Sequence, residues 1–408
     1  MTTSSRARVA VAGPARDGVL LAPAREPTRV LELVGGALVL FAWSPPGVPG
    51  FLSVGLLTLT AGLAVASVRR PPRRLEDLGL GWLAPVLVLV LAYLVLASLT
   101  TPDTSVSGWP RRALRLASVG LFLLELVSGR LHYPSLVRGM ALGAVGNYVL
   151  FVAGVAPAPY GQYLSGYYLD KNQAGLVCVV VGLLLTGLVE RRSRQVLVLL
   201  ATSWLVWETG SRTSLAALAC AVAWIVLRPR VERTGRVVLG VALAAGVQVL
   251  ETSFSRVGTF ADRFGSDVLR ERIDDASRLV LERSPVQGAG LGEAYVVVDE
   301  NVFFFHNSYW TALVEGGWVL AAGYVAVTVL LGVGLLRPGR DPGPWVAAEA
   351  ANVAVLVCAL RLGEVFGTTV ATTALAGGIL GLLAHRARTR AVDREAGAAT
   401  GAVPAPVA

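Results

Sequence analysis

The most reactive candidate side chain in the sequence is a histidine at position 306. His306 is followed by Asn307, Ser308 and Tyr309, and a neutral imidazole can accept a proton at neutral pH. The alternative interpretation is a histidine that anchors a helix end at the lipid headgroups. Asn307 and Tyr309 could orient a bound molecule or form hydrogen bonds at a helix start, and we favour the structural role.

Cationic side chains provide candidates for anion binding. Arg212 is expected to begin a helix, where free backbone N–H groups add to an anion site. The alternative interpretation of Arg212 is an arginine at a helix end whose side chain extends to the lipid headgroups. Arg270 lies among many charges and could bind a ligand or be a solvated surface charge. Lys171, the only lysine, is expected to open another helix together with Asn172. Lys171 could bind an anion or a sugar, or it could be a cation that lies at a helix end near the membrane surface.

Charged residues within apolar stretches need partners. Glu315 is expected two turns into the helix that follows His306, where a carboxylate is costly and is usually paired or functional. It could pair with an Arg or polarise a site residue. Glu125 and Arg115, within the fourth predicted span, are predicted to be structural partners of other helices. Arg361 and Glu364 are predicted to form a local ion pair.

The sequence predicts no metal site and no cofactor. His132 and His385 fall on the side of the membrane opposite His306, so the three histidines cannot share a metal. Every cysteine lies inside an apolar run, which disfavours a disulfide framework or a thiolate metal site. No glycine-rich phosphate loop or nucleotide-binding fingerprint occurs.

Composition predicts an all-α polytopic membrane protein. Hydrophobic residues make up 54% of the 408 residues, charged residues only 15%, and the mean hydropathy is +0.62, whereas soluble domains are about a quarter charged. The net charge of +9 is spread over short arginine clusters. Because these clusters form no continuous basic stripe, nucleic acid is not an expected partner.

The arginine clusters also predict the arrangement of the chain. Cations gather in every second connection, which by the positive-inside rule places both termini in the cytoplasm. The expected parts are a disordered cytoplasmic tail at 1–28, transmembrane helices 1–9 at 29–251, an extracytoplasmic loop at 252–305, transmembrane helices 10–12 at 306–390 and a disordered cytoplasmic tail at 391–408. The twelve predicted spans are 29–43, 51–68, 82–99, 112–128, 135–156, 172–189, 194–208, 212–227, 235–251, 306–335, 345–362 and 366–384.

The large loop is expected to contain one amphipathic helix. From Phe260 to Val280, apolar residues recur at three- to five-residue steps among charges, a pattern typical of a helix that lies on a membrane or covers a cavity. The helix is predicted to end at Ser284–Pro285. Residues 287–292, rich in glycine, are predicted to be a flexible turn, and the aromatic residues of 303–310 are predicted to re-enter the bilayer.

The order of these motifs resembles the O-antigen ligase and polymerase superfamily. The resemblance runs from about Tyr160 to the last helix, and the helix number and large outward loop agree with it. Its motifs are Asp170-Lys171-Asn172-Gln173-Ala174-Gly175, Thr209-Gly210-Ser211-Arg212-Thr213, Arg270, Pro285, Gly288-Ala289-Gly290, His306-Asn307-Ser308-Tyr309 and Glu315-Gly316-Gly317.

The resemblance implies glycosyl transfer from an undecaprenyl-diphosphate-linked glycan to an acceptor hydroxyl on a glycan or lipid-linked acceptor, outside the cytoplasmic membrane. Arg212 and Arg270, with Lys171, would hold the diphosphate, because guanidinium forks suit phosphate oxygens. His306 would be the base. Asn172, Asn307, Tyr309 and Glu315 would support them. Two alternatives are a secondary transporter of a small solute and a noncatalytic scaffold for envelope assembly.

Overall fold

The computed structural model describes residues 27–100, 108–254, 264–335, 337 and 345–399. These residues are mostly helical, which confirms the predicted helical class. Short 3-10 segments occur at Gly166–Tyr168 and Arg228–Arg230. The α-helices are α1 (Val30–Leu38), α2 (Val54–Ser67), α3 (Leu83–Thr100), α4 (Trp109–Val127), α5 (Tyr133–Val152), α6 (Lys171–Leu188), α7 (Arg192–Thr209), α8 (Arg212–Leu227), α9 (Arg233–Phe254), α10 (Phe264–Arg283), α11 (Ser308–Val327), α12 (Val346–Ala359) and α13 (Thr369–Ala399).

Several of these helices can cross a membrane. One α-helix overlaps each of the twelve predicted spans, although several of these helices begin or end outside the predicted bounds. Among the described residues, six segments are long and apolar enough to span a bilayer: Leu83–Thr100, Tyr133–Val152, Lys171–Leu188, Arg212–Arg230, Ser308–Gly332 and Thr369–Val392. By contrast, α1 has nine residues, or about 14 Å of helix, roughly half the hydrocarbon thickness. The structure is therefore consistent with a membrane protein.

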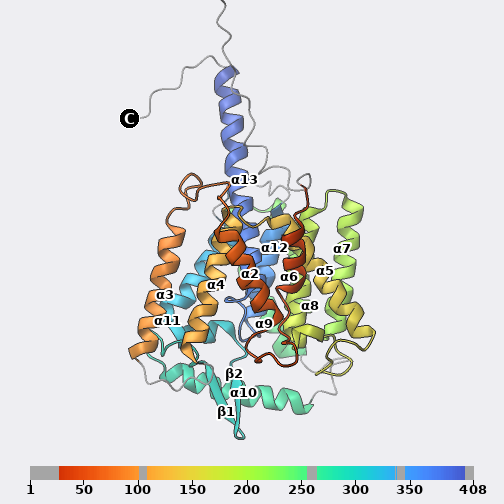
Figure 1. Ribbon diagram of the computed structural model, residues 1–408, viewed down its shortest axis with the longest axis vertical. Coiled ribbons are helices and arrows are strands. Elements are labelled where there is room, and N and C mark those ends of the chain that lie inside the picture. Colours follow the sequence, from red (N-terminus) through yellow and green to blue (C-terminus); the bar gives the residue numbers. More distant parts are fainter. Residues whose placement is uncertain (1–26, 101–107, 255–263, 336, 338–344, 400–408) are drawn as a thin grey trace, which may run out of the picture.

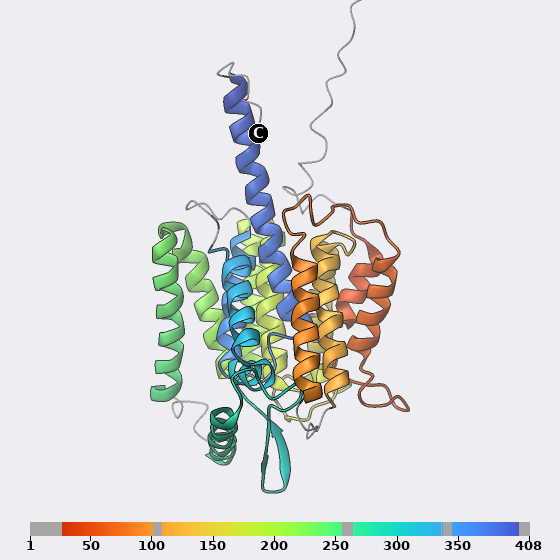
Figure 2. The same ribbon diagram turned by 90° about the vertical axis from the view of Figure 1, so that its left-hand side faces the viewer.

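The connections between helices gather at two opposite ends of the bundle. At one end, the α2–α3 and α4–α5 connections meet, where Arg69 donates to Arg130 O at 3.1 Å. Figures 1 and 2 place the C-terminal part of α13 at this end and α10 at the other. We call the first the Arg-rich end, because the arginine clusters of the described connections lie there.

A helix and a hairpin cover the opposite end of the bundle (Figure 1). The amphipathic pattern correctly predicted α10, whose buried Ile273 packs against the antiparallel strands β1 (Tyr295–Val298) and β2 (Asn301–Phe304) and the start of α11. The hairpin was not predicted. Asp299 and Glu300 at its tip both have positive φ, as a tight two-residue turn requires.

The hairpin corrects the prediction for residues 303–310. Phe303 and Phe304 belong to β2, and the helix begins only at Ser308. Phe304 is exposed, whereas Phe305 is buried against the layer formed by α10. Exposed and buried side chains alternate at the start of the aromatic run, as in a strand. The run therefore begins in a strand, and only its last residues belong to a helix.

The glycine-rich turn that was predicted to be flexible is instead docked against a break in α11. Gly316 and Gly317 have non-helical φ and ψ, which frees backbone groups of the helix. The turn supplies their partners: Ala289 N–H donates to Val314 O at 2.6 Å, and Trp318 N–H donates to Val286 O at 3.3 Å. A Cβ on Gly317 would lie 2.1 Å from Val286 O, so only glycine permits this approach.

The C-terminal prediction also needs correction. The tail expected from residue 391 begins as helix, because α13 continues to Ala399. Alternating Ala and Arg residues are strong helix formers and extend α13 beyond the bundle (Figure 2). Residues 1–26 of the predicted N-terminal tail and 400–408 of the C-terminal tail lie outside the described residues.

Candidate functional site

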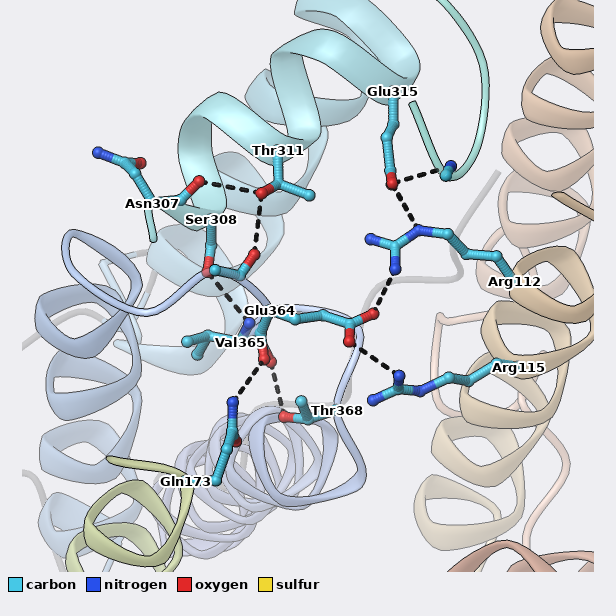
Figure 3. Close-up of polar contacts among 12 residues, drawn as sticks. Arg112, Arg115, Gln173, Asn307, Ser308, Thr311, Glu315, Glu364, Val365 and Thr368 are labelled. Atoms are coloured by element: carbon cyan, nitrogen blue, oxygen red, sulfur yellow. Dashed lines mark hydrogen bonds and ion pairs between the residues drawn. The ribbon is translucent and has the colours of Figure 1, made fainter. Parts of the chain in front are cut away.

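The connection between α12 and α13, residues 360–368, lies at the centre of the candidate site. It is fixed to the first turn of α11 by Ser308, whose hydroxyl donates to Leu362 O and accepts the Val365 N–H at 3.1 Å. Gln173 of α6 donates from its side chain to Glu364 O at 3.4 Å. The starts of α6 and α11 and the α12–α13 connection are thus held together (Figure 3).

Gly363 allows the close contact between this connection and the hairpin. A Cβ at Gly363 would lie 1.7 Å from Phe305 O, so any larger residue would push the two segments apart. Thr311 stabilises the same turn by donating to Gly363 O at 2.9 Å. Backbone contacts on both sides therefore help to position the connection.

Four charged side chains meet beside this connection, and Figure 3 shows them pointing toward one another. The Arg112 Nε lies 2.6 and 2.8 Å from the two carboxylate oxygens of Glu315, and its Nη1 lies 2.6 Å from Glu364 Oε1. Arg115 Nη1 lies 2.8 Å from Glu364 Oε2. We call these four residues the open network, because the Glu364 side chain is 33% exposed and that of Arg115 is 45% exposed.

The arginines around Glu364 favour the charged form of its carboxyl. Burial disfavours its charge, but Arg115 and Arg112 together outweigh burial and hold the pKa of its carboxyl below its ordinary value. The predicted local pair of Arg361 with Glu364 is wrong. Arg361 instead approaches Asp274, because the fixed turn at Gly363 directs the two side chains to different neighbours.

His306 lies in a second cluster next to the open network. Its Nδ1 is 3.7 Å from Asp274 Oδ1, and Arg361 Nη1 is 3.5 Å from Asp274 Oδ2. Arg270 of α10 donates to Arg361 O at 3.4 Å. We call these four residues the His306 cluster. The His306 side chain is 32% exposed while its Nδ1 is buried, so a molecule can reach the ring.

The cationic residues at the starts of α6 and α8 form a separate neighbourhood at the same end. Lys171 Nζ lies 4.6 Å from the centre of the Tyr163 ring. Gly175 of α6 faces Ser214 of α8 so closely that a Cβ would lie 2.3 Å from its hydroxyl. Lys171 and Arg212, as the first residues of these helices, therefore lie near each other. Among the described contacts, none joins Arg212 to His306 or Arg270.

Three of the predicted supporting residues have contacts within the protein that stabilise its helices. Asn307 is the N-cap of α11, and its side-chain oxygen accepts the N–H groups of Tyr309 and Trp310 at 2.9 and 3.2 Å, as the structural interpretation expects. The Tyr309 hydroxyl donates to Leu356 O at 2.9 Å. The backbone N–H of Asn172 donates to the α6 N-cap Asp170 at 2.8 Å.

Sequence reasoning missed Arg112 and gave Asp274 no role of its own. Arg112 and Arg115 lie three residues apart on one apolar helix, and such a spacing puts both guanidiniums on one face. That spacing, together with the carboxylates of Glu315 and Glu364, was the available signal. Asp274 could not be distinguished from the other charges of α10, since only the fold brings it to His306.

These groups suit anion binding and proton transfer. Guanidiniums beside an accessible imidazole can hold phosphate oxygens, and a carboxylate beside the ring can stabilise its protonated form. Within the described part of the chain, no three His, Cys, Asp or Glu side chains are grouped as a metal site would need.

Comparisons with known proteins add no family assignment. No protein-family model matches the chain, and no curated protein matches it.

Proposed function

We propose that the chain is a membrane glycosyltransferase of the O-antigen ligase or polymerase type. It would transfer a glycan from an undecaprenyl-diphosphate carrier to an acceptor hydroxyl outside the cytoplasmic membrane. The observation that carries the proposal is the His306 cluster, in which an accessible imidazole lies with Asp274, Arg361 and Arg270 at one end of an apolar helical bundle. The motif order in the sequence supports the same reaction.

The proposed reaction needs one base and an anion-binding group. The acceptor oxygen attacks the anomeric carbon, His306 accepts the hydroxyl proton, and the bond from the anomeric carbon to the diphosphate oxygen breaks. Asp274, 3.7 Å from His306, stabilises the imidazolium that forms. The diphosphate leaves with the electron pair, and Arg270 of the His306 cluster holds it. Positioning and electrostatic stabilisation provide most of the rate gain.

The open network would position the cluster. Arg112 and Arg115 hold Glu364, and Glu364 lies three residues after Arg361 in the same fixed connection. Moving Glu364 would therefore move Arg361 and, through Asp274, the partner of His306. In this proposal Glu315 and Glu364 are positioning residues.

The proposed topology has twelve helices crossing or entering the bilayer of the cytoplasmic membrane, with both termini in the cytoplasm. The distribution of arginine supports this orientation, because the Arg-rich end then faces inward and the His306 cluster faces outward. The short α1 would enter the bilayer without spanning it alone.

The test is transfer by the purified protein in proteoliposomes that contain a lipid-diphosphate-linked glycan and an acceptor glycan. His306→Ala is expected to abolish transfer while the variant still inserts and elutes as a folded protein. His132→Ala, which alters a histidine at the Arg-rich end, is the matched control for transfer. Undiminished product from His306→Ala would contradict the assignment of the base.

A secondary transporter is the second candidate, favoured by the break in α11 at Gly316 and Gly317. Transporters bind solutes at such discontinuous helices. The same proteoliposomes distinguish the two functions: substrate-driven flux without formation of a glycosidic product would favour transport, whereas product without flux would favour transfer.

A further inference from the structure

The docked glycine-rich turn, residues 285–292, reaches inside the end of the bundle that α10 covers (Figure 1). Val286 O accepts the Trp318 N–H at 3.3 Å, and Trp318 lies up to about 15 Å from the start of α11. Gln287 O accepts the Tyr93 hydroxyl at 2.5 Å, and Tyr93 lies about 10 Å before the end of α3. The tip of the turn therefore lies inside the level of both helix ends.

The outer side of this tip is apolar. Val286 is 74% exposed, and Trp318, to which its backbone is bonded, is 65% exposed. Val319, the next residue of α11, is 56% exposed. Both helices that hold the turn, α3 and α11, are long and apolar enough to span a bilayer. The exposed tip is therefore continuous with the surface of a candidate membrane span, which faces lipid chains.

The backbone of the turn has the partners that such a depth requires. Irregular backbone is tolerated within a bilayer only where protein groups satisfy its N–H and C=O groups. Five consecutive N–H groups of the turn donate to protein oxygens: Gly288 to Pro285 O at 2.8 Å, Ala289 to Val314 O at 2.6 Å, Gly290 to Glu315 O at 3.2 Å, Leu291 to Ser98 Oγ at 2.9 Å and Gly292 to Glu315 Oε1 at 3.0 Å. Residues 285–292 also include no charged side chain.

We propose that residues 285–292 form a re-entrant turn whose tip lies among the lipid chains of the bilayer, in the leaflet at the α10 end. Val286 and Trp318 contact lipid chains there. The segment that joins α10 to β1 is then not wholly outside the membrane, and it ties the C-terminal end of α10 to the bilayer. Arg283, which is exposed at the end of α10, extends its side chain to the headgroups.

A nitroxide label on the full-length protein in lipid nanodiscs reports the surroundings of the tip. The three native cysteines are buried, so labelling is confined to the introduced one. The test variant is Val286→Cys. Val88→Cys on α3, at a side chain that is 66% exposed, is the reference for lipid, and Val297→Cys on the hairpin, at one that is 60% exposed, is the reference for water.

Electron paramagnetic resonance measures how often each label collides with oxygen, which concentrates in lipid chains, and with a nickel chelate, which stays in water. We expect the ratio of oxygen to nickel collisions at position 286 to match that at position 88 and to exceed that at position 297 several-fold. A ratio at 286 equal to that at 297 would overturn the proposal. Should position 88 also be in water, the membrane assignment itself would be wrong and the proposal with it.

A charged substitution provides a second, independent readout. Val286→Asp places a carboxylate among lipid chains, where it is costly, and is expected to lower the unfolding temperature in nanodiscs. Val297→Asp is the control and should lower the unfolding temperature less. An equal or smaller effect of Val286→Asp would also overturn the proposal. Because neither measurement uses glycan transfer, the result does not depend on the proposed enzymatic activity.

Discussion

The two ends of the bundle contain charge networks of similar composition but different exposure. At the Arg-rich end, Glu349 accepts from Arg228 at 2.9 Å and from Arg337 at 2.5 Å, and the three side chains are at most 1% exposed. At the other end, Arg112 lies between Glu315 and Glu364, and a third of the Glu364 side chain is exposed. We call the Glu349 group the buried network.

This difference separates structural charge from charge that a ligand can reach. The carboxylate of Glu349 also lies 3.4 Å from the Trp224 indole nitrogen, so protein groups surround it. A buried network fixes helices together but offers no path to a substrate. The open network and the neighbouring His306 cluster combine fixed geometry with access, which a reaction site requires.

The largest expected effect follows from breaking the buried network. Glu349→Ala leaves Arg228 and Arg337 buried without the carboxylate between them, and loss of one partner of a buried ion pair typically costs about 3–5 kcal/mol. We expect little folded protein and a lower unfolding temperature in detergent. The measurement is thermal unfolding followed by tryptophan fluorescence, and wild-type stability would show that Glu349 does not hold the helices.

Mutation of the open network should reduce activity and leave folding nearly unchanged. Glu364→Gln keeps the side-chain volume but removes the charge that holds Arg112 and Arg115. We expect folding close to that of the wild type and at least a tenfold loss of glycan transfer, because Arg361 would no longer be held in position. The control is Asp299→Asn, which alters an exposed ion pair of the hairpin and should leave transfer unchanged. Full activity in Glu364→Gln would contradict the positioning role.

The smallest effect is a dependence of stability on pH. The pKa of Glu364 is lowered in the folded state. The contribution of its ionised carboxyl to the free energy of unfolding is therefore complete above the ordinary carboxylate pKa, and it is lost as the pH falls through the lowered pKa. The wild-type protein should therefore lose more stability than Glu364→Gln below about pH 4. Unfolding temperatures of the two proteins across this range provide the measurement, and parallel curves would argue against the lowered pKa.

The sequence was sufficient to locate the helices because apolar runs and arginine clusters are local signals. It also indicated α10, whose pattern of apolar residues is explicit. It did not reveal the β1–β2 hairpin or the docked glycine turn, since both are stabilised by partners distant in the chain. For example, Ala289 N–H donates to Val314 O beside the break in α11 at Gly316.

The candidate site was only partly predictable for the same reason. His306, Arg270 and Glu315 stood out by residue type and motif. Asp274 could be identified only when the fold brought it to His306, and the fold was needed to pair Arg112 with Glu315. Arg361 was assigned to the wrong partner because proximity in sequence favoured Glu364, whereas the turn at Gly363 separates their side chains.

The most direct test of the account compares donor binding with turnover in one variant. His306→Ala should bind the lipid-diphosphate-linked glycan with nearly wild-type affinity, because the cationic residues that hold the diphosphate are retained, and should form no glycosidic product. Product formation at the wild-type rate at saturating donor would contradict a catalytic centre at His306.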